Sequence, residues 1–306
     1  MCALCGSPIR PKPDPALDQV PITRPARLML PLHAMRPWVS WALLAANVAV
    51  WLAMTLTGGS TNPLVLLRFG AKFGPAILVG EYWRLLTTIF LHIGLLHLLL
   101  NSYALYILGP EVERFFGSAR FLTVYVLAGL VGSGGSYLFE STLAAGASGA
   151  IFGLVGALAT FYYRNRRLLG PMGQRRLSTL ASLVLINLVI GFTVPNLDNW
   201  AHLGGLAGGL LAGWALSPQY QVVGSPADGW QVVDRTAKRP AWWIIPVGLA
   251  LVAALTMGGN WRESAVVAGY RQGPDAQLRV GPWEEAIATW SPVPELETGI
   301  GRLAPG

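Results

Sequence analysis

Residues 199–217 read NWAHLGGLAGGLLAGWALS. This run contains no Asp, Glu, Lys or Arg, and its length is close to the roughly 20 apolar residues that a helix needs to cross a membrane. Glycines at positions 205, 209 and 213 recur every four residues and would form one smooth helix face. The stretch therefore predicts a membrane helix that packs closely against a neighbour and carries one histidine, His202, near its start.

Six further uncharged apolar runs occupy residues 38–58, 94–110, 121–138, 147–163, 177–195 and 241–258. Only 12% of the 306 residues are charged, against about 25% in an average soluble domain, and 53% are hydrophobic. We therefore predict an all-α polytopic membrane protein with a six-helix bundle over residues 38–217. One extra C-terminal transmembrane helix is expected at residues 241–258.

The segments between and outside these runs are more polar or irregular. Residues 1–37 are rich in Pro and Arg and predict a basic, mostly flexible N-terminal tail. Residues 218–240 predict a polar linker, and residues 259–306 a second tail in which 283–290 suit one amphipathic helix. The connection 59–93 is apolar and aromatic but lacks a full span, which favours the membrane interface. Its Trp83-Arg84 pair suits that level, where an indole ring is favoured and an arginine reaches polar groups.

The distribution of basic residues predicts the orientation. If the N-terminus is cytoplasmic, fifteen of the 22 Lys and Arg residues lie on the inner side, and only Arg68, Lys72 and Arg84 lie in the outer loops between spans. This asymmetry follows the positive-inside rule. It accounts for the net charge of +7 without a nucleic-acid partner, and the lipid bilayer is the expected surroundings. We expect a multi-pass protein of the cell membrane, with bacterial plasma membrane favoured. No pattern indicates an oligomeric state.

The two cysteines, Cys2 and Cys5, form a Cys-x-x-Cys pair in the N-terminal tail. On the cytoplasmic side a structural disulfide is disfavoured. The pair also resembles half of a zinc site, but a structural zinc needs four ligands and His33 is the only other nearby candidate. We favour a reduced pair and predict no metal.

Polar side chains inside the spans are costly in lipid and mark a candidate site. The orientation brings His97, Ser148 and His202 to a similar depth near the outer ends of their helices. A serine becomes a nucleophile when a base removes its proton, and histidine is the usual base near neutral pH. His97 and Asn101, four residues apart, share one helix face and can donate to a developing oxyanion together with the Ser148 amide.

The ordered set of motifs resembles the rhomboid family of intramembrane proteases. It consists of Trp83-Arg84, His92 leading to His97 and Asn101, Gly146-Ala-Ser148-Gly149, and Ala201-His202-Leu-Gly-Gly205. The resemblance covers about residues 38–217 and implies a Ser148–His202 dyad and an oxyanion site of His97, Asn101 and the Ser148 amide. It also implies an aromatic ring, here Phe152, stacked on the base. The expected substrates are transmembrane segments of other proteins, and the chemistry needs no cofactor.

Other interpretations fit less well. An α/β-hydrolase elbow would need glycine where Ala150 stands, and the His-Glu-x-x-His of a zinc protease is absent. A proton-coupled transporter would carry Asp or Glu inside the spans. A noncatalytic rhomboid-like scaffold or chaperone remains the alternative. His92 is interpreted as structural. Asp198 is interpreted as a helix N-cap rather than the acid of a catalytic triad.

Overall fold

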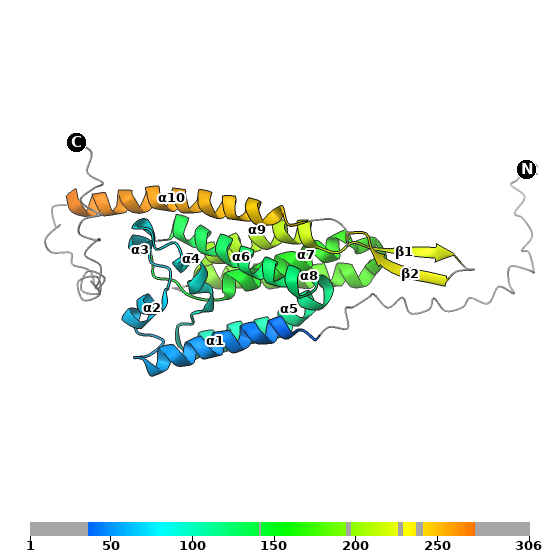
Figure 1. Ribbon diagram of the computed structural model, residues 1–306, viewed down its shortest axis with the longest axis horizontal. Helices are drawn as coiled ribbons and strands as arrows, with labels where there is room; N and C mark the ends of the chain where they lie inside the picture. The colour runs from blue at the N-terminus through cyan, green and yellow to red at the C-terminus, as the bar shows by residue number, and fades with distance from the viewer. Residues whose placement is uncertain (1–35, 141, 194–196, 226–228, 237–240, 273–306) are drawn as a thin grey trace, which may run out of the picture.

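The computed structural model describes residues 36–140, 142–193, 197–225, 229–236 and 241–272. Each of the seven predicted runs forms a long helix, and these helices run side by side in one elongated bundle (Figure 1). The predicted helical membrane bundle is therefore confirmed. The helices are α1 (Trp38–Leu56), α5 (Gly94–Phe116), α6 (Ser118–Phe139), α7 (Ser148–Arg164), α8 (Arg166–Thr193), α9 (Asn199–Leu216) and α10 (Ile244–Gln272).

Four of these helices, α1, α6, α8 and α10, are both long and apolar enough to cross a membrane. Residues Arg84–Phe90 and α5 supply a fifth span if this pair, bent by 89°, is counted as one. The chain is thus a multi-pass membrane protein. Helix α7 is short, with 17 residues, and the arrangement of six spans plus one stays a prediction.

The first connection folds as three short helices and one 3-10 turn at one end of the bundle (Figure 1). They are α2 (Pro63–Phe69), α3 (Gly74–Leu78), α4 (Arg84–Thr87) and η1 (Thr88–Phe90). Trp83 is 49% exposed, as an interfacial indole should be.

The expectation that Arg84 reaches toward lipid headgroups is wrong. Its side chain is fully buried, and Nη1 donates to the carbonyl oxygens of Leu67 at 2.8 Å and Ala71 at 3.2 Å. Nε of Arg84 pairs with Glu81. The planar guanidinium thus ties together the last turn of α2 and the residue after its C-cap.

Helix α5 continues beyond residue 110, where the predicted apolar run ends, through Glu111 and Glu113 to Phe116. The Glu113 carboxylate accepts hydrogen bonds from the Val39 amide at 3.1 Å, the Ser40 amide at 2.8 Å and the Ser40 hydroxyl at 2.7 Å. These are donors in the first turn of α1, whose N-cap residue Pro37 provides no side-chain hydrogen bond. A buried carboxylate therefore caps α1 from another helix, which explains why charge is tolerated here.

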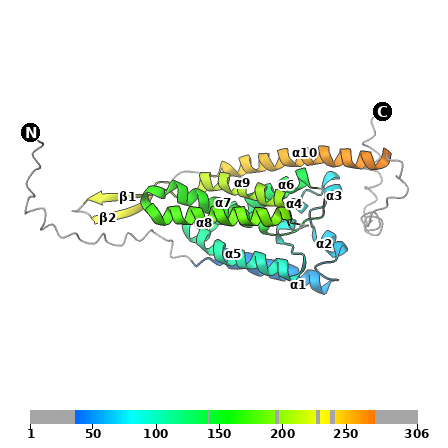
Figure 2. The same cartoon turned by 180° about the vertical axis from the view of Figure 1, so that it is seen from behind.

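Three other boundaries differ from the expectations. The linker contains an antiparallel hairpin of β1 (Tyr220–Ser225) and β2 (Gly229–Asp234), which projects from the end opposite α2 and α3 (Figure 2). Helix α8 begins at Arg166 and kinks at Gly170, where φ is 51°. Helix α10 continues beyond residue 258 to Gln272. Helices need not end where their hydrophobic run ends, because polar residues beyond the apolar run can continue the hydrogen-bonded backbone.

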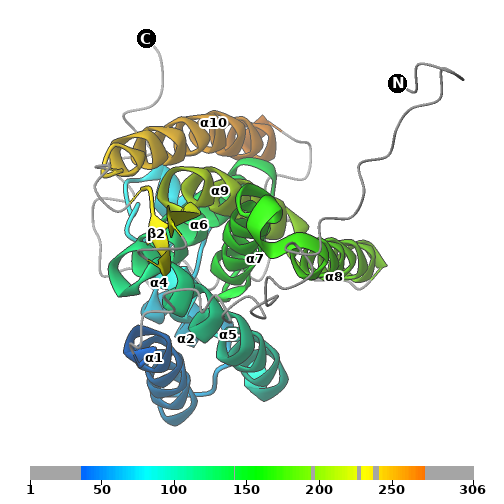
Figure 3. The same cartoon turned by 90° about the vertical axis from the view of Figure 1, so that its right-hand side faces the viewer.

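Helix α6 lies at the centre, surrounded by α7, α9 and α10 (Figure 3). Glycines allow these helices to approach at backbone distance. A Cβ at Gly205 would overlap the carbonyl oxygen of Gly149, and one at Gly132 would lie 2.8 Å from the carbonyl oxygen of Ala201. The predicted close packing of the glycine-rich helices is confirmed, and α9 is pressed between α6 and α7.

Candidate active site

Ser148 is the first residue of α7, so its amide belongs to the donors that an α-helix leaves unpaired at its start. The preceding segment is held by main-chain bonds. Ala144 forms an antiparallel bridge with Lys72, and the Gly146 amide donates to the Thr88 carbonyl oxygen at 3.0 Å. Gly146 has a φ of 150°, which favours glycine. The serine therefore stands at the junction of a fixed extended segment and a helix N-terminus.

His202 lies in the first turn of α9 and is 8% exposed. The helix begins at Asp198, whose carboxylate Oδ1 accepts from the Ala201 amide at 2.8 Å. The His202 amide in turn donates to the carbonyl oxygen of Asp198 at 3.2 Å. This confirms the interpretation of Asp198 as the N-cap, and the cap fixes the direction in which the imidazole leaves the helix.

The two side chains meet between α7 and α9. Nε2 of His202 lies 3.0 Å from Oγ of Ser148, which is hydrogen-bond distance. The ring of Phe152, one turn after the serine, stacks on the imidazole with a centroid distance of 4.4 Å and an interplanar angle of 8°. On the other side, a Cβ at Gly149 would lie 3.2 Å from the Ala201 carbonyl oxygen. Imidazole and hydroxyl are thus positioned by helices in backbone contact.

The direction of the hydrogen bond between His202 and Ser148 depends on which ring nitrogen of His202 carries the proton. Nδ1 has no hydrogen-bond partner among the residues that the structure describes. Asp198 uses its carboxylate on Ala201 and on Ser136, whose hydroxyl donates to Oδ2. A neutral imidazole with its proton on Nδ1 leaves Nε2 as an acceptor for the Ser148 hydroxyl. In the described parts of the chain, no third side chain bonds Nδ1 of His202.

His97 faces the same site from the start of α5. Its Nδ1 accepts from the Ile93 amide at 3.3 Å, so the neutral ring carries its proton on Nε2. A Cβ at Gly146 would lie 2.8 Å from Nε2 and Cε1 of His97, so a donor edge borders the segment before Ser148. His92 packs edge-on against His97, with ring centroids 5.3 Å apart. The Asn101 amide nitrogen donates to the His97 carbonyl oxygen at 3.0 Å.

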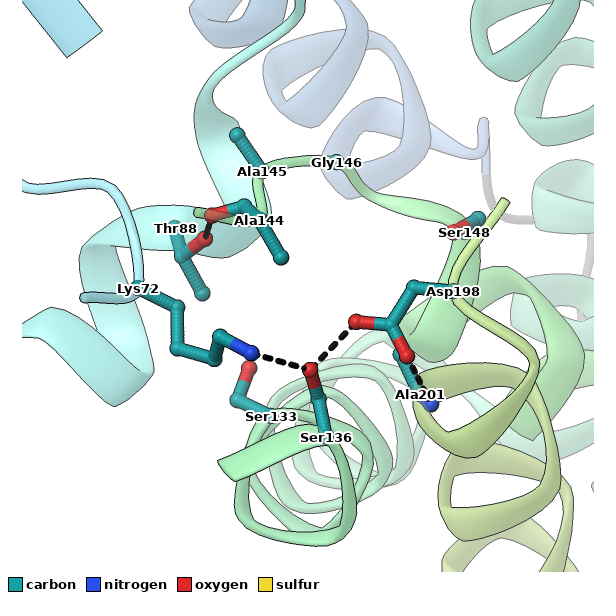
Figure 4. Close-up of a pocket in the computed structure, with 10 residues that line it drawn as sticks. All are labelled: Lys72, Thr88, Ser133, Ser136, Ala144, Ala145, Gly146, Ser148, Asp198 and Ala201. Carbon is teal, nitrogen blue, oxygen red and sulfur yellow. Dashed lines mark hydrogen bonds between the residues drawn. The ribbon is translucent and has the colours of Figure 1, made fainter. Parts of the chain in front are cut away.

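A pocket with a cavity volume of about 30 Å³ adjoins Ser148 (Figure 4). Its lining includes polar side chains from three segments, namely Lys72 from the first connection, Ser136 from α6 and Asp198 before α9. Lys72 is 1% exposed, and its Nζ donates to Ser136 Oγ at 2.9 Å and to the Glu140 carbonyl oxygen at 2.8 Å. A buried, hydrogen-bonded lysine therefore lines the pocket next to the serine.

Comparison with known proteins gives concordant matches. The family model described as the Rhomboid domain matches residues 79–219. Putative rhomboid protease YdcA of Bacillus subtilis (strain 168) is 39% identical over 175 residues, which cover 55% of this chain and 83% of YdcA. The chain belongs to the rhomboid family. Rhomboid protease GluP of the same organism is 44% identical over 182 residues, covering 59% of this chain but only 35% of GluP. RHOMBOID-like protein 7 of Arabidopsis thaliana is 32% identical over 217 residues, covering 68% of each chain.

In this rhomboid, the predicted site residues other than Asn101, whose amide nitrogen bonds within its own helix, fall into two groups. Ser148, His202, Phe152, Gly146, Gly149, His97 and His92 converge around one point. Trp83 and Arg84 serve the fold of the first connection instead, and the Arg84 guanidinium lies 4.7 Å from the Trp83 ring centroid. Cys2, Cys5 and His33 lie outside the described residues. Within the described ranges, no group of three or more His, Cys, Asp or Glu residues could hold a metal ion.

Two residues near the rhomboid site were missed by sequence reasoning. Lys72 was counted only as a basic residue of an outer loop, and Ser136 was not singled out. Nothing in their local sequence indicates that they meet. One available signal was the charge of Lys72 within an otherwise apolar connection, since a lysine there needs a partner if it is buried.

Proposed function

We propose that this rhomboid is a serine endopeptidase that cleaves transmembrane segments of other membrane proteins. The observation that carries the proposal is the 3.0 Å contact between Ser148 Oγ and His202 Nε2, with Phe152 stacked on the imidazole. The relatives GluP and YdcA are named as a rhomboid protease and a putative rhomboid protease, which supports the same reaction class.

The first half of the reaction transfers the substrate acyl group to the enzyme. Nε2 of His202 takes the hydroxyl proton of Ser148, and Oγ attacks the carbonyl carbon of the scissile peptide bond. The tetrahedral intermediate then collapses as the imidazolium gives its proton to the departing amide nitrogen. One product leaves with a new amino terminus, and the other is esterified to Ser148. In the second half, water attacks this ester with His202 again as base, and Ser148 recovers its proton.

The negative oxygen of each tetrahedral intermediate needs donors that are already in position, since losing one typically costs about 10²- to 10³-fold in rate. We assign this role to Nε2–H of His97, the Ser148 amide and the Asn101 side chain. His97 is supported by its fixed tautomer and by the approach of its ring to Gly146. The Ser148 amide is supported by its position at the start of α7, where the helix dipole also favours negative charge.

The expected orientation supports a particular place of cleavage. With a cytoplasmic N-terminus, Ser148 and His202 lie toward the outer side of a plasma membrane, so substrate helices would be cut near their outer ends. A peptide bond inside a regular helix is shielded by backbone hydrogen bonds and side chains. We therefore expect substrates whose spans contain small or helix-breaking residues near that level. The bundle of residues 38–217 would form the catalytic core.

The test uses the full chain purified in detergent with a single-pass model substrate. Ser148→Ala and His202→Ala are each expected to reduce cleavage by more than about a thousandfold, because a nucleophile and its base act as a unit. Ser182→Ala, an exposed serine on α8, is the matched control and should cleave as wild type does. Undiminished cleavage by Ser148→Ala, with an unchanged thermal unfolding midpoint, would contradict the proposal.

The second candidate, a noncatalytic scaffold or chaperone, would bind membrane proteins without cutting them. Such a protein gains nothing from a base in contact with a hydroxyl. The same experiment separates the two functions. If the protein is a scaffold, wild type releases no fragment, and both variants still bind the uncut substrate.

A further inference from the structure

Lys72 occupies an unusual place for a lysine, buried between the first connection and the helices of the site. Its main chain binds the segment before Ser148, and its side chain is linked to the start of α9. The main chain forms the bridge to Ala144, with the Lys72 amide donating at 2.9 Å and its carbonyl accepting at 3.1 Å. The Ala144 carbonyl also accepts from the Thr88 hydroxyl at 2.7 Å. This segment leads directly to Ser148.

The side chain of Lys72 extends toward the histidine instead. Nζ donates to the Ser136 hydroxyl, that hydroxyl donates to Asp198, and Asp198 accepts from the Ala201 amide (Figure 4). We call these three side chains the Lys72–Ser136–Asp198 chain. The chain ends at Asp198, which binds the amide of Ala201, the residue directly before His202. A single loop residue is therefore linked to the segments that carry both members of the dyad.

We propose that Lys72 is a positioning residue for the dyad, holding the Ser148 segment through its main chain and the first turn of α9 through Ser136 and Asp198. The inference rests on the proposed protease function for its catalytic consequence. A half-buried carboxylate beside a buried hydroxyl needs a compensating charge, and the Lys72 ammonium supplies it. With Lys72 charged, Asp198 is held in place to accept from Ala201, which keeps His202 directed at Ser148.

The electrostatic surroundings of Lys72 make this link sensitive to pH. Burial lowers the pKa of Lys72 to about 8, while the carboxylates of Asp198, Glu140 and Glu263 oppose that shift and Arg262 adds to it. Below pH 8 the ammonium is present and the chain is intact. As the pH rises through 8, Lys72 loses its proton and the charge that compensates Asp198. Activity is therefore expected to decline on the alkaline side.

The first experiment is a double-mutant cycle on cleavage by the full chain. Lys72→Met is expected to lower kcat/KM by about 10- to 100-fold, the range in which small misplacements of reacting groups fall. Asp198→Asn keeps a good N-cap but removes the charge. In that background, Lys72→Met should cost less than about threefold, because the two changes remove the same interaction. Arg68→Met removes an exposed cation of the same connection and is the matched control.

The second experiment is the pH profile of Lys72→Arg. A guanidinium stays charged throughout the accessible range, so the alkaline decline near pH 8 should move to higher pH or disappear. A purely structural lysine would not change the profile in this way. This measurement also decides the case if Lys72→Met does not fold.

Hydrogen exchange separates this inference from the protease proposal, because it needs no catalysis. In the Ser148→Ala protein, Lys72→Met should speed exchange in peptides covering the start of α9, and Arg68→Met should not. The inference is overturned if exchange there is unchanged, if Lys72→Met costs the same in both backgrounds, or if the Lys72→Arg profile matches wild type. If wild type shows no cleavage that depends on Ser148, but Lys72→Met still speeds exchange at the start of α9, only the proposed protease function is rejected.

Discussion

Helices α9 and α8 show opposite ways of sitting in this bundle. Helix α9 meets α6 and α7 through glycines, with backbone in contact with backbone. Helix α8 packs mainly on α7 and exposes large apolar side chains such as Leu185 and Phe192. The comparison teaches that the Ser148–His202 geometry depends on the helices that have the least side-chain volume, while the most hydrophobic surface contributes little to it.

The lipid bilayer explains this difference between α8 and α9. Lipid tails are as apolar as leucine, so exposed leucines on α8 gain nothing by leaving the bilayer. Association inside the membrane depends on close packing, and small residues permit the closest packing. A dyad that must hold 3.0 Å between two helices is therefore best built on glycine faces.

The largest effect is expected from disrupting the glycine contact between α9 and α7. Gly205→Leu would drive a side chain into the Gly149 carbonyl, which cannot move without shifting α7. Because a 1 Å displacement of reacting groups can cost about 100-fold, we expect cleavage to fall by at least that factor. Ala207→Leu adds the same side chain on an exposed position of α9 and should cleave nearly as wild type. Equal activity of the two variants would show that the glycine contact does not set the geometry.

A smaller effect is expected from the ring that borders the base. Phe152→Leu removes the stack on His202 while keeping an apolar side chain. Aromatic pairs contribute about 0.5–1.5 kcal/mol, so kcat should fall by about two- to tenfold. Phe192→Leu, on the exposed face of α8, makes the same chemical change away from the site. A loss of equal size in both variants would argue for a general effect on the membrane fold.

The smallest effect is expected on α8. Leu185→Ala shortens a side chain that is 64% exposed. Surface substitutions of this kind usually change stability by less than about 0.5 kcal/mol, so cleavage and the thermal unfolding midpoint should stay close to wild type. The check is to measure both in the same detergent. A marked loss of cleavage without a loss of stability would mean that α8 contributes to the reaction beyond covering α7.

Much of the fold was predictable because its determinants are local. Uncharged runs and four-residue glycine spacing are visible in the sequence, and alternating topology brought His97, Ser148 and His202 to one end. The partners of charged groups were not predictable. Arg84 and Glu113 each bind the backbone of a distant segment, so their burial depends on tertiary contacts that no local pattern records. The same holds for Lys72, whose partners come from α6 and the loop after it.

The carboxylate of Glu113 has a consequence for the order in which the protein is made. The first amides of α1 are buried against a group that lies 73 and 74 residues further along the chain. When α1 leaves the ribosome, that acceptor has not yet been synthesised. The first helix can therefore insert early. Its first turn can bond to Glu113 only after the end of α5 has followed it into the membrane.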